Sequence, residues 1–421
     1  MRILFLTQIL PLPLDAGPRV RAYYVLRYLA EAGHEVSLVS FVRSGESLEN
    51  VRPLQEICHS VETIPLVRSQ LRNLCDGLHS MFTEMPFLIL RDQVAPMREM
   101  IRKLTTRRSF DAMHADQLWM APYCLDCRGP RLKVLDQHNA VFMVPRRMAE
   151  HQPNALVKAF LRKEASKLEA FEQQTCSRFD RVVWVTKEDR KAVCSQGNAG
   201  GRGDLVIPIA VDAKAHEPVK RTEPFRVTFV GGMHWPPNLE GISWFVEQVW
   251  PKVARTEPSA ILTLIGKGVS RKLHGQCSGG RIEIAGYVRD LQQYISETAV
   301  FLVPIQSGAG MRVKILDAWC WGLPVVSTTV GAEGLRTATG ENLLIADDEQ
   351  TFADSVIRVL QNSDVAQRLS DGGRATVEQF YDWREAYRAW DQIYQTDWNP
   401  AREQDMPSLM AETAISSGVI R

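Results

Sequence analysis

The amino-acid sequence predicts an α/β protein made of two doubly wound, Rossmann-like domains with parallel sheets. Short apolar runs alternate with helical stretches, and this alternation restarts after a polar segment at residues 213–224. The 421 residues are enough for two domains of ordinary size. Charge is also divided: residues 1–205 carry 29 Lys and Arg against 23 Asp and Glu, whereas the remainder carries 21 against 26. The division favours two units with different partners.

In the first half, the apolar run at residues 2–7 predicts a buried strand, and residues 23–32 predict an amphipathic helix that Gly33 ends. A long charged helix is expected at residues 155–178. The glycine-rich passage at 196–203 predicts a surface loop. Further strands are expected at 35–42, 62–66, 110–114, 132–136, 181–186 and 205–209.

The second half repeats the pattern and ends in an aromatic, charged helix at residues 383–397, which should cross back to the first domain. Its strands are expected at 226–231, 260–265, 281–285, 299–305, 323–327 and 342–346. The predicted organisation is an N-terminal domain at 1–208, a linker at 209–224, a C-terminal domain at 225–382, the cross-over helix, and a disordered tail at 398–421.

Composition excludes several classes of protein. A hydrophobic content of 45% and a charged content of 24% are typical of a soluble globular protein. A net charge of +1 argues against a nucleic-acid binder, and the sequence lacks an apolar run long enough for a transmembrane helix. Cys124 and Cys127 form an isolated pair, so no zinc site is expected. Scattered reduced thiols and a start without a signal peptide predict a cytoplasmic protein.

The most informative segment is residues 307–318, which together with the preceding apolar run at 300–305 predicts a strand, a glycine turn and a helix. Backbone N–H groups near Gly308 and Gly310 can bind an anion, because the N-terminus of a helix favours negative charge. Arg312 and Lys314 add cations, and Asp317 shares a helix face with Lys314. The segment therefore predicts a site for a pyrophosphate, with a carboxylate near the ribose hydroxyls. The alternative is an ordinary helix N-terminus with solvated charges.

Four segments together resemble family 4 glycosyltransferases of the GT-B fold, over nearly the whole chain. The branch that they resemble is the sugar transferases associated with bacterial exopolysaccharide synthesis. The resemblance implies an acceptor-binding N-terminal domain and a C-terminal domain that binds a nucleotide-diphosphate sugar, facing each other across a deep cleft. The four segments are residues 11–21, 134–139, 230–238 (followed by Trp250 and Pro251), and 307–318 with its extension to 334.

The resemblance also assigns donor-binding residues. The glutamate pair of the family would fall on Ala309 and Asp317, so one carboxylate is shortened and the other is lost. The family's Arg and Lys after the first C-terminal strand are replaced in residues 231–234. We therefore expect Arg312 and Lys314 to neutralise the diphosphate. The residues expected to bind the donor are Gly17, Arg19, Gly231, Gly232, His234, Gly308, Ala309, Gly310 and Met311.

In the N-terminal half, His138 follows an apolar strand, and the resemblance implies that it contacts the transferred sugar or its reaction centre. The alternative is a structural histidine. Gly17 would allow close backbone approach to a ligand. Arg19 would pair with phosphate, or would be a solvated loop arginine. Asp15 and Asn139 are the candidates for acceptor binding.

The predicted catalytic residues are therefore His138, Arg312, Lys314 and Asp317. The sequence contains no Asp-x-Asp, which predicts transfer without a metal or other cofactor. The resemblance implies a retaining enzyme, with a UDP-sugar favoured over a GDP-sugar and a glycan, lipid-linked glycan or small molecule as acceptor. Basic and apolar residues at 68–108 would lie on an anionic membrane at its inner face, or form a solvated helical face. Two alternatives are a nucleotide-sugar epimerase and a silent nucleotide- or glycan-binding protein.

Overall fold

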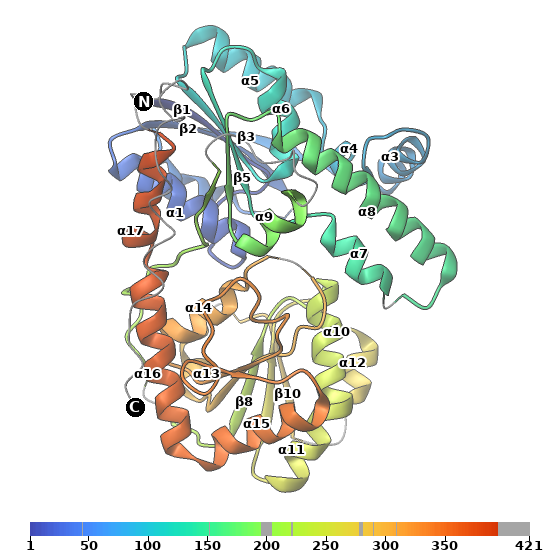
Figure 1. Cartoon of the computed structure of the whole chain (residues 1–421), viewed down its shortest axis with the longest axis vertical. Helices are drawn as coiled ribbons and strands as arrows, with labels where there is room; N and C mark the ends of the chain where they lie inside the picture. The colour runs from blue at the N-terminus through green and yellow to red at the C-terminus, as the bar shows by residue number, and fades with distance from the viewer. Residues whose placement is uncertain are drawn as a thin grey trace, which may run out of the picture.

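The computed structural model contains two parallel sheets, one in each half of the chain (Figure 1). Helices cover both faces of each sheet, as the sequence predicts. The structure describes residues 1–43, 45–150, 152–194, 204–219, 222–277, 281–288, 290–308 and 310–394. The loop expected at 196–203 and the tail expected at 398–421 lie outside these residues.

The first sheet has seven strands in the order β3-β2-β1-β4-β5-β6-β7. Ile3 pairs with Val36 on one side and with Ala112 on the other, so β1 lies where the strand order reverses. Ligands of such sheets bind outside the carboxyl ends of the strands at this point. The strands are β1 Arg2–Thr7, β2 Glu35–Arg43, β3 Ser60–Leu66, β4 Ala112–Asp116, β5 Leu132–Gln137, β6 Arg181–Trp184 and β7 Leu205–Val206.

The second sheet has six strands in the order β10-β9-β8-β11-β12-β13, the same winding. The expected strands are confirmed, although several are shorter than predicted. The run at 205–209 leaves the sheet after Val206, because Pro208 cannot donate to a neighbouring strand. The strands are β8 Arg226–Val230, β9 Ile261–Ile265, β10 Ile282–Gly286, β11 Val300–Val303, β12 Val325–Ser327 and β13 Leu344–Ile345.

The helices of the first half include the two expected ones. α1 begins at Gly17, earlier than predicted, because Pro18 is well suited to the first turn of a helix. α8 spans Ala155–Cys176, and the side chain of Asn154 caps its first turn. The helices are α1 Gly17–Glu31, α2 Arg52–Ile57, α3 Gln70–Phe82, α4 Phe87–Leu90, α5 Ala95–Arg107, α6 Ala121–Asp126, α7 Met143–Glu150, α8 and α9 Lys187–Cys194.

The helices of the second half surround its sheet and end in one long helix, α16, along the side of the molecule (Figure 1). They are α10 Pro236–Trp244, α11 Trp250–Thr256, α12 Arg271–Gln276, α13 Gln292–Ser296, α14 Val313–Cys320, α15 Glu349–Gln361 and α16 Ser363–Phe380. None of the helices in the described part of the chain combines the length and apolar character needed to cross a membrane.

The C-terminal segment crosses back to the first half, as expected, but it is not one helix over 383–397. It consists of α17 Trp383–Ala386 and a 3₁₀-helical turn at Tyr387–Gln392. The tighter winding brings side chains three residues apart into line, so Tyr387 and Trp390 are both buried. Trp383 stacks on Tyr24 of α1, with ring centroids 5.7 Å apart. In Figure 1, α17 lies beside α1.

Candidate functional site

The glycine loop and α14 form the centre of the site, and the predicted strand, turn and helix are confirmed. Gly308 and Gly310 have φ values of 111° and 78°, which side chains other than glycine rarely adopt. A Cβ atom on Gly310 would lie 3.0 Å from Cβ of Asn139 and 3.2 Å from the carbonyl oxygen of His138. The glycine loop of the second half therefore lies directly against the end of β5. Ala309 lies outside the described residues.

Lys314 crosses from α14 to the loop that follows β8. Its Nζ donates to Oδ1 of Asn238 at 3.0 Å and lies 4.6 Å from the centre of the Phe229 ring. The amide of Asn238 in turn donates to the carbonyl of Gly232 at 2.9 Å. A Cβ atom on Gly231 would lie 2.8 Å from this Nζ, so glycine makes room for the ammonium group. The structure thus brings together the predicted residues of both loops.

Burial dominates the pKa values of the charged groups at the start of α14. Burial lowers the pKa of Lys314 to about 7, and repulsion from Arg312 adds to this effect. Burial also lowers the pKa of Arg312 to about 10. It raises the pKa of Asp317 to about 7, and the attraction of Lys314 only partly opposes the change. All three side chains retain some access to solvent. Each shift favours the neutral form of its group, so an entering anion would oppose the shifts of both cations and would restore the partly lost charge of Lys314.

His138 follows β5 and is held by two carboxylates of the first sheet. Its Nε2 lies 2.9 Å from Oδ1 of Asp116, which ends β4, and 3.7 Å from Oδ2 of Asp136. Burial alone would lower the pKa of His138, but the two carboxylates outweigh burial and raise it to about 9. The side chain is therefore an imidazolium at neutral pH.

Asp136 is also bound by Arg21, a completely buried arginine of α1. Two guanidinium nitrogens donate to the two oxygens of Asp136, at 2.9 and 2.8 Å. A third donates to the carbonyls of Ile207 and Pro208 at 2.8 and 2.6 Å. Burial opposes both charges, yet the mutual attraction of the pair outweighs it, raising the pKa of Arg21 and holding that of Asp136 below its usual range.

Sequence reasoning assigned no role to Arg21, Asp116 or Asp136. The available signal was that each aspartate stands at or next to the carboxyl end of a strand, where the ligands of doubly wound sheets bind. The pairing of Arg21 with Asp136 spans 115 residues of sequence, so no local pattern indicates it.

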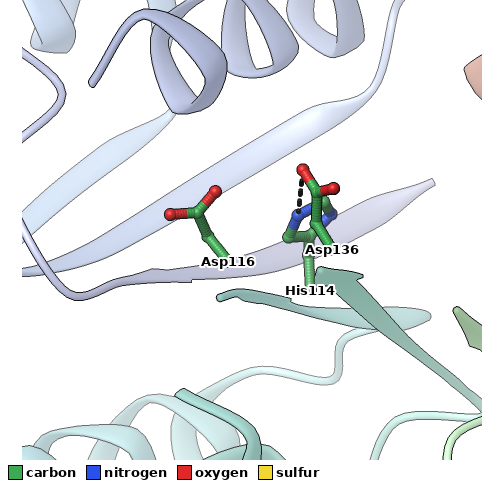
Figure 2. A group of neighbouring side chains, drawn as sticks. All are labelled: His114, Asp116 and Asp136. Carbon is green, nitrogen blue, oxygen red and sulfur yellow. Dashed lines mark ion pairs between the residues drawn. The ribbon is translucent and has the colours of Figure 1, made fainter. Parts of the chain in front are cut away.

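His114, Asp116 and Asp136 offer ligand atoms within 4.8 Å of one another (Figure 2), a spacing that a metal ion could use. His114 lies 3.9 Å from Asp136, and its Nδ1 is 2.6 Å from the hydroxyl of Tyr394. Burial lowers the pKa of His114 to about 3, so this ring is neutral. Each carboxylate already faces a cation, the imidazolium or the guanidinium described above. A divalent ion would have to displace both, so this donor set does not fit a metal centre.

Buried acids hold the loop that carries His138. Glu172 of α8 accepts hydrogen bonds from the backbone N–H groups of Val141 and Phe142, at 2.7 and 3.0 Å. Asp189 of α9 accepts from that of Ala140 at 2.8 Å. Burial raises the pKa of Glu172 to about 8. Two helices therefore fix the backbone that follows β5.

The two halves also meet through Arg147 of α7. Its guanidinium donates to the carbonyl of Gly308 and makes two hydrogen bonds with Glu333, at 2.8 and 2.9 Å. At the start of α1, a Cβ atom on Gly17 would lie 3.2 Å from Cγ2 of Val313 in α14. Gly17 thus packs against α14, the helix that follows the glycine loop, and its role in donor binding stays a prediction.

Other predicted residues lie at the margin or pack in the protein. Arg19 pairs with Glu46 and lies 3.5 Å from Asp15, so acids of the first half already balance its charge. Asp15 is about half exposed, with 49% of its side chain accessible. His234 is exposed, and Met311 is buried.

Comparison with known proteins agrees with this architecture. Residues 224–362 match the family model described as glycosyl transferases group 1. A protein of Klebsiella pneumoniae, described as an uncharacterized 44.6 kDa protein in the cps region, is 24% identical over 402 residues, covering 90% of this chain and 95% of that protein. The lipopolysaccharide core biosynthesis glycosyltransferase LpsE of Rhizobium meliloti is 29% identical over 127 residues, 28% of this chain and 37% of LpsE.

Solved structures share the fold at low sequence identity. HepE from Anabaena, in complex with UDP, superposes with a TM-score of 0.64 at 15% identity, covering 93% of this chain and 99% of HepE. Sucrose-phosphate synthase from Thermosynechococcus elongatus gives a TM-score of 0.67 at 18% identity, covering 94% and 98%. The second half of the chain therefore matches glycosyl transferases group 1, and the two parallel sheets give the whole chain the GT-B fold of these solved structures.

Proposed function

We propose that the chain transfers a sugar from a nucleoside-diphosphate sugar to an acceptor hydroxyl, with retention of configuration and without a metal ion. The observation that carries this proposal is the group formed by Arg312, Lys314 and Asp317. Burial shifts all three pKa values toward the neutral forms, so a diphosphate bound beside the two cations would favour their charged forms. UDP is the favoured nucleotide, because HepE of similar fold binds UDP and UDP-glucose.

In the proposed complex, the diphosphate lies at the N-terminus of α14, between Arg312 and Lys314. As the bond between the sugar and the diphosphate breaks, negative charge grows on the diphosphate oxygens. The two cations and the helix dipole stabilise that charge in a site with little water, which is where such stabilisation is largest. Asp317, one turn after Lys314, accepts hydrogen bonds from the ribose hydroxyls.

His138 acts in this proposal as a positive hydrogen-bond donor. Its Nε2 faces Asp116, while its Nδ1 has no hydrogen-bond partner within the described residues. We assign this N–H to the transferred sugar or the diphosphate, because a buried donor without a partner is costly and the carbonyl of His138 lies next to the glycine loop. A ring that is already protonated at neutral pH cannot act as the base.

Retention is proposed to follow from attack on the face that the diphosphate leaves. The acceptor oxygen bonds to the anomeric carbon, the bond from that carbon to the diphosphate oxygen breaks, and the acceptor proton moves to a diphosphate oxygen. No protein base is needed for this sequence. The acceptor is proposed to be a glycan or lipid-linked glycan, since the relatives are named for a cps region and for lipopolysaccharide core biosynthesis.

The test is calorimetric titration with UDP and with GDP, in the presence of EDTA, for the wild type and Asp317→Ala. We expect UDP to bind more tightly than GDP, with affinity at least about tenfold weaker in the variant, the value of one hydrogen bond to a charged group. Asp354→Ala, on the exposed face of α15, is the matched control and should bind as the wild type does. If neither nucleotide binds, or if EDTA abolishes binding, the proposal is wrong.

One feature favours a second candidate, a binding protein without turnover: Ala309 stands where the family carries a glutamate. Incubation of UDP-glucose with candidate glycan acceptors separates the two. UDP release that depends on the acceptor supports a transferase, whereas tight UDP binding without release from any UDP-sugar supports the second candidate.

A further inference from the structure

Helix α3 turns its polar face toward the protein and its apolar face toward solvent. Arg72, Asp76 and Ser80 are one turn apart and face inward, and Ser80 is the buried residue of this helix. Arg72 donates to the carbonyl of Gln93 at 2.9 Å, and Oγ of Ser80 donates to Glu164 at 3.0 Å. Polar contacts thus fix the rotation of the helix. The opposite face exposes Leu71 (78%), Leu74 (62%), Leu78 (51%) and Phe82 (85%).

A second exposed apolar stripe lies on the first turns of α8, at Leu156, Val157 and Phe160. The next turns of α8 hold the C-terminal end of α3. Nζ of Lys163 donates to the carbonyl of Met81 at 3.2 Å, and Nζ of Lys167 donates to that of Ser80 at 2.5 Å. The two stripes therefore belong to neighbouring helices. Figure 1 shows α3 and α8 on the side of the first sheet away from α17.

Basic residues accompany these stripes. Residues 152–163 carry Lys158, Arg162 and Lys163 and contain no acid, whereas Arg68 and Arg72 near the stripe of α3 pair with Asp92 and Asp76. Lys158 and Arg162 follow the apolar residues of α8 within one or two turns. Apolar side chains interleaved with cations match the surface of an anionic bilayer, where the apolar groups enter the acyl boundary and the cations reach the lipid phosphates. A stable protein partner would more often bury an apolar patch with few charges.

We propose that the outer faces of α3 and the first turns of α8 form a docking surface for an anionic lipid bilayer. The surface is defined by Leu71, Leu74, Leu78, Phe82, Leu156 and Phe160. It is carried by the half whose Arg147 reaches the glycine loop, so docking would bring the site near the lipid headgroups. Binding to lipid does not depend on sugar transfer, and the two proposals can fail separately.

The experiment is co-sedimentation of the full chain with vesicles of phosphatidylcholine alone and with about 30% phosphatidylglycerol. We expect binding to the anionic vesicles only, weakening when salt rises from about 50 to about 500 mM. The double substitution Leu74→Ser with Leu78→Ser should weaken vesicle binding by at least about tenfold, because each change removes apolar area that the bilayer would bury. Lys158→Gln with Arg162→Gln should weaken binding and reduce its salt dependence.

Leu48→Ser is the matched control, since Leu48 is 64% exposed elsewhere in the same half, and it should bind vesicles as the wild type does. Circular dichroism and thermal unfolding of every variant check that the fold is intact. The proposal is wrong if the wild type does not bind anionic vesicles, or if the double serine variant binds them equally well. A dimer that dissociates in that variant, without vesicle binding, would assign the surface to a second copy and also overturn the proposal.

Discussion

The buried charged groups on the two sides of the site differ in the direction of their pKa shifts. In the first half, Arg21, Asp136, Asp116 and His138 compensate one another, and the pKa values of Arg21, Asp136 and His138 shift toward the charged forms. In the second half, the three charged groups of α14 shift toward the neutral forms. The first group pairs two cations with two carboxylates, although burial still raises the pKa of Asp116, whereas burial dominates every shift of the second group.

This difference indicates that the first group serves mainly stability and the second mainly ligand binding. A compensated network holds its geometry at any ligand concentration, because removing one member leaves another charge buried and unpaired. Charged groups that burial destabilises are stabilised most when an oppositely charged ligand enters. Their interaction energy with that ligand therefore contributes to binding and catalysis rather than to folding. We therefore expect substitutions in the first group to affect stability first, and those in the second to affect donor binding and turnover.

The largest effect should come from Lys314→Met, which removes a cation from the proposed diphosphate site without adding a charge. We expect kcat/KM to fall by about 10²- to 10³-fold, as for loss of one donor to a developing negative charge. Stability should change little or rise, since a buried ammonium is removed. Lys252→Met is the control, because Lys252 pairs with Glu349 at the surface. Activity near that of the wild type would show that Lys314 does not contact the diphosphate.

Asp116→Asn tests the compensated network. Since His138 loses its nearest counter-charge, unfolding free energy should fall by about 3 kcal/mol and the pKa of His138 should drop, as NMR titration of the ring would show. The folded pKa of about 9 exceeds the unfolded 6.5, so this stabilisation is complete below pH 6.5 and is lost toward pH 9. The deficit of the variant should shrink over the same range.

The exposed pair of Asp126 with Arg98 provides the control for that comparison. Asp126→Asn should change the unfolding free energy by less than about 1 kcal/mol, at every pH in this range. A deficit in Asp116→Asn that stayed constant from pH 6.5 to pH 9 would contradict the assigned imidazolium.

Gly310→Ala tests the contact between the two groups, and Gly340→Ala is its control. Both glycines have positive φ, 78° and 86°, so each substitution costs roughly 1–2 kcal/mol of backbone energy. Only Gly310 has neighbours that an added Cβ would strike, Asn139 and the carbonyl of His138. Gly310→Ala should therefore be the less stable variant in urea and should also raise KM for the donor. Equal behaviour would mean that the halves separate easily.

The smallest effect should be proton uptake when UDP binds. Near pH 8 the Lys314 side chain is mostly a neutral amine in the empty site. A bound diphosphate should raise its pKa, so that the amine takes up a proton. Calorimetry in two buffers of different ionisation enthalpy should show uptake of up to about one proton, with affinity falling as pH rises from 7 to 8. Asp317 is already mostly ionised at pH 8 and adds little. Lys314→Met should abolish the uptake, and identical enthalpies in both wild-type titrations would contradict the mechanism.

Local patterns in the sequence predicted the two sheets and the turn into α14, because apolar runs and glycines act over a few residues. They did not predict the network around Asp136, whose arginine comes from α1. They also misjudged residues 383–394, the described part of the expected terminal helix, because side chains that recur every three residues fit a 3₁₀ turn as well as an α-helix. The pattern of α3 indicates two faces but not which one is buried, since Glu164 and Gln93 decide this from elsewhere.

The return of the C-terminal segment has a consequence for synthesis on the ribosome. Trp390 and Tyr394 pack on His114, and Trp383 packs on Tyr24, so the earliest part of the chain is completed by some of its last residues. The nascent first half must emerge with that apolar surface uncovered until nearly the whole chain has been translated. Such exposed apolar surface favours association between nascent chains.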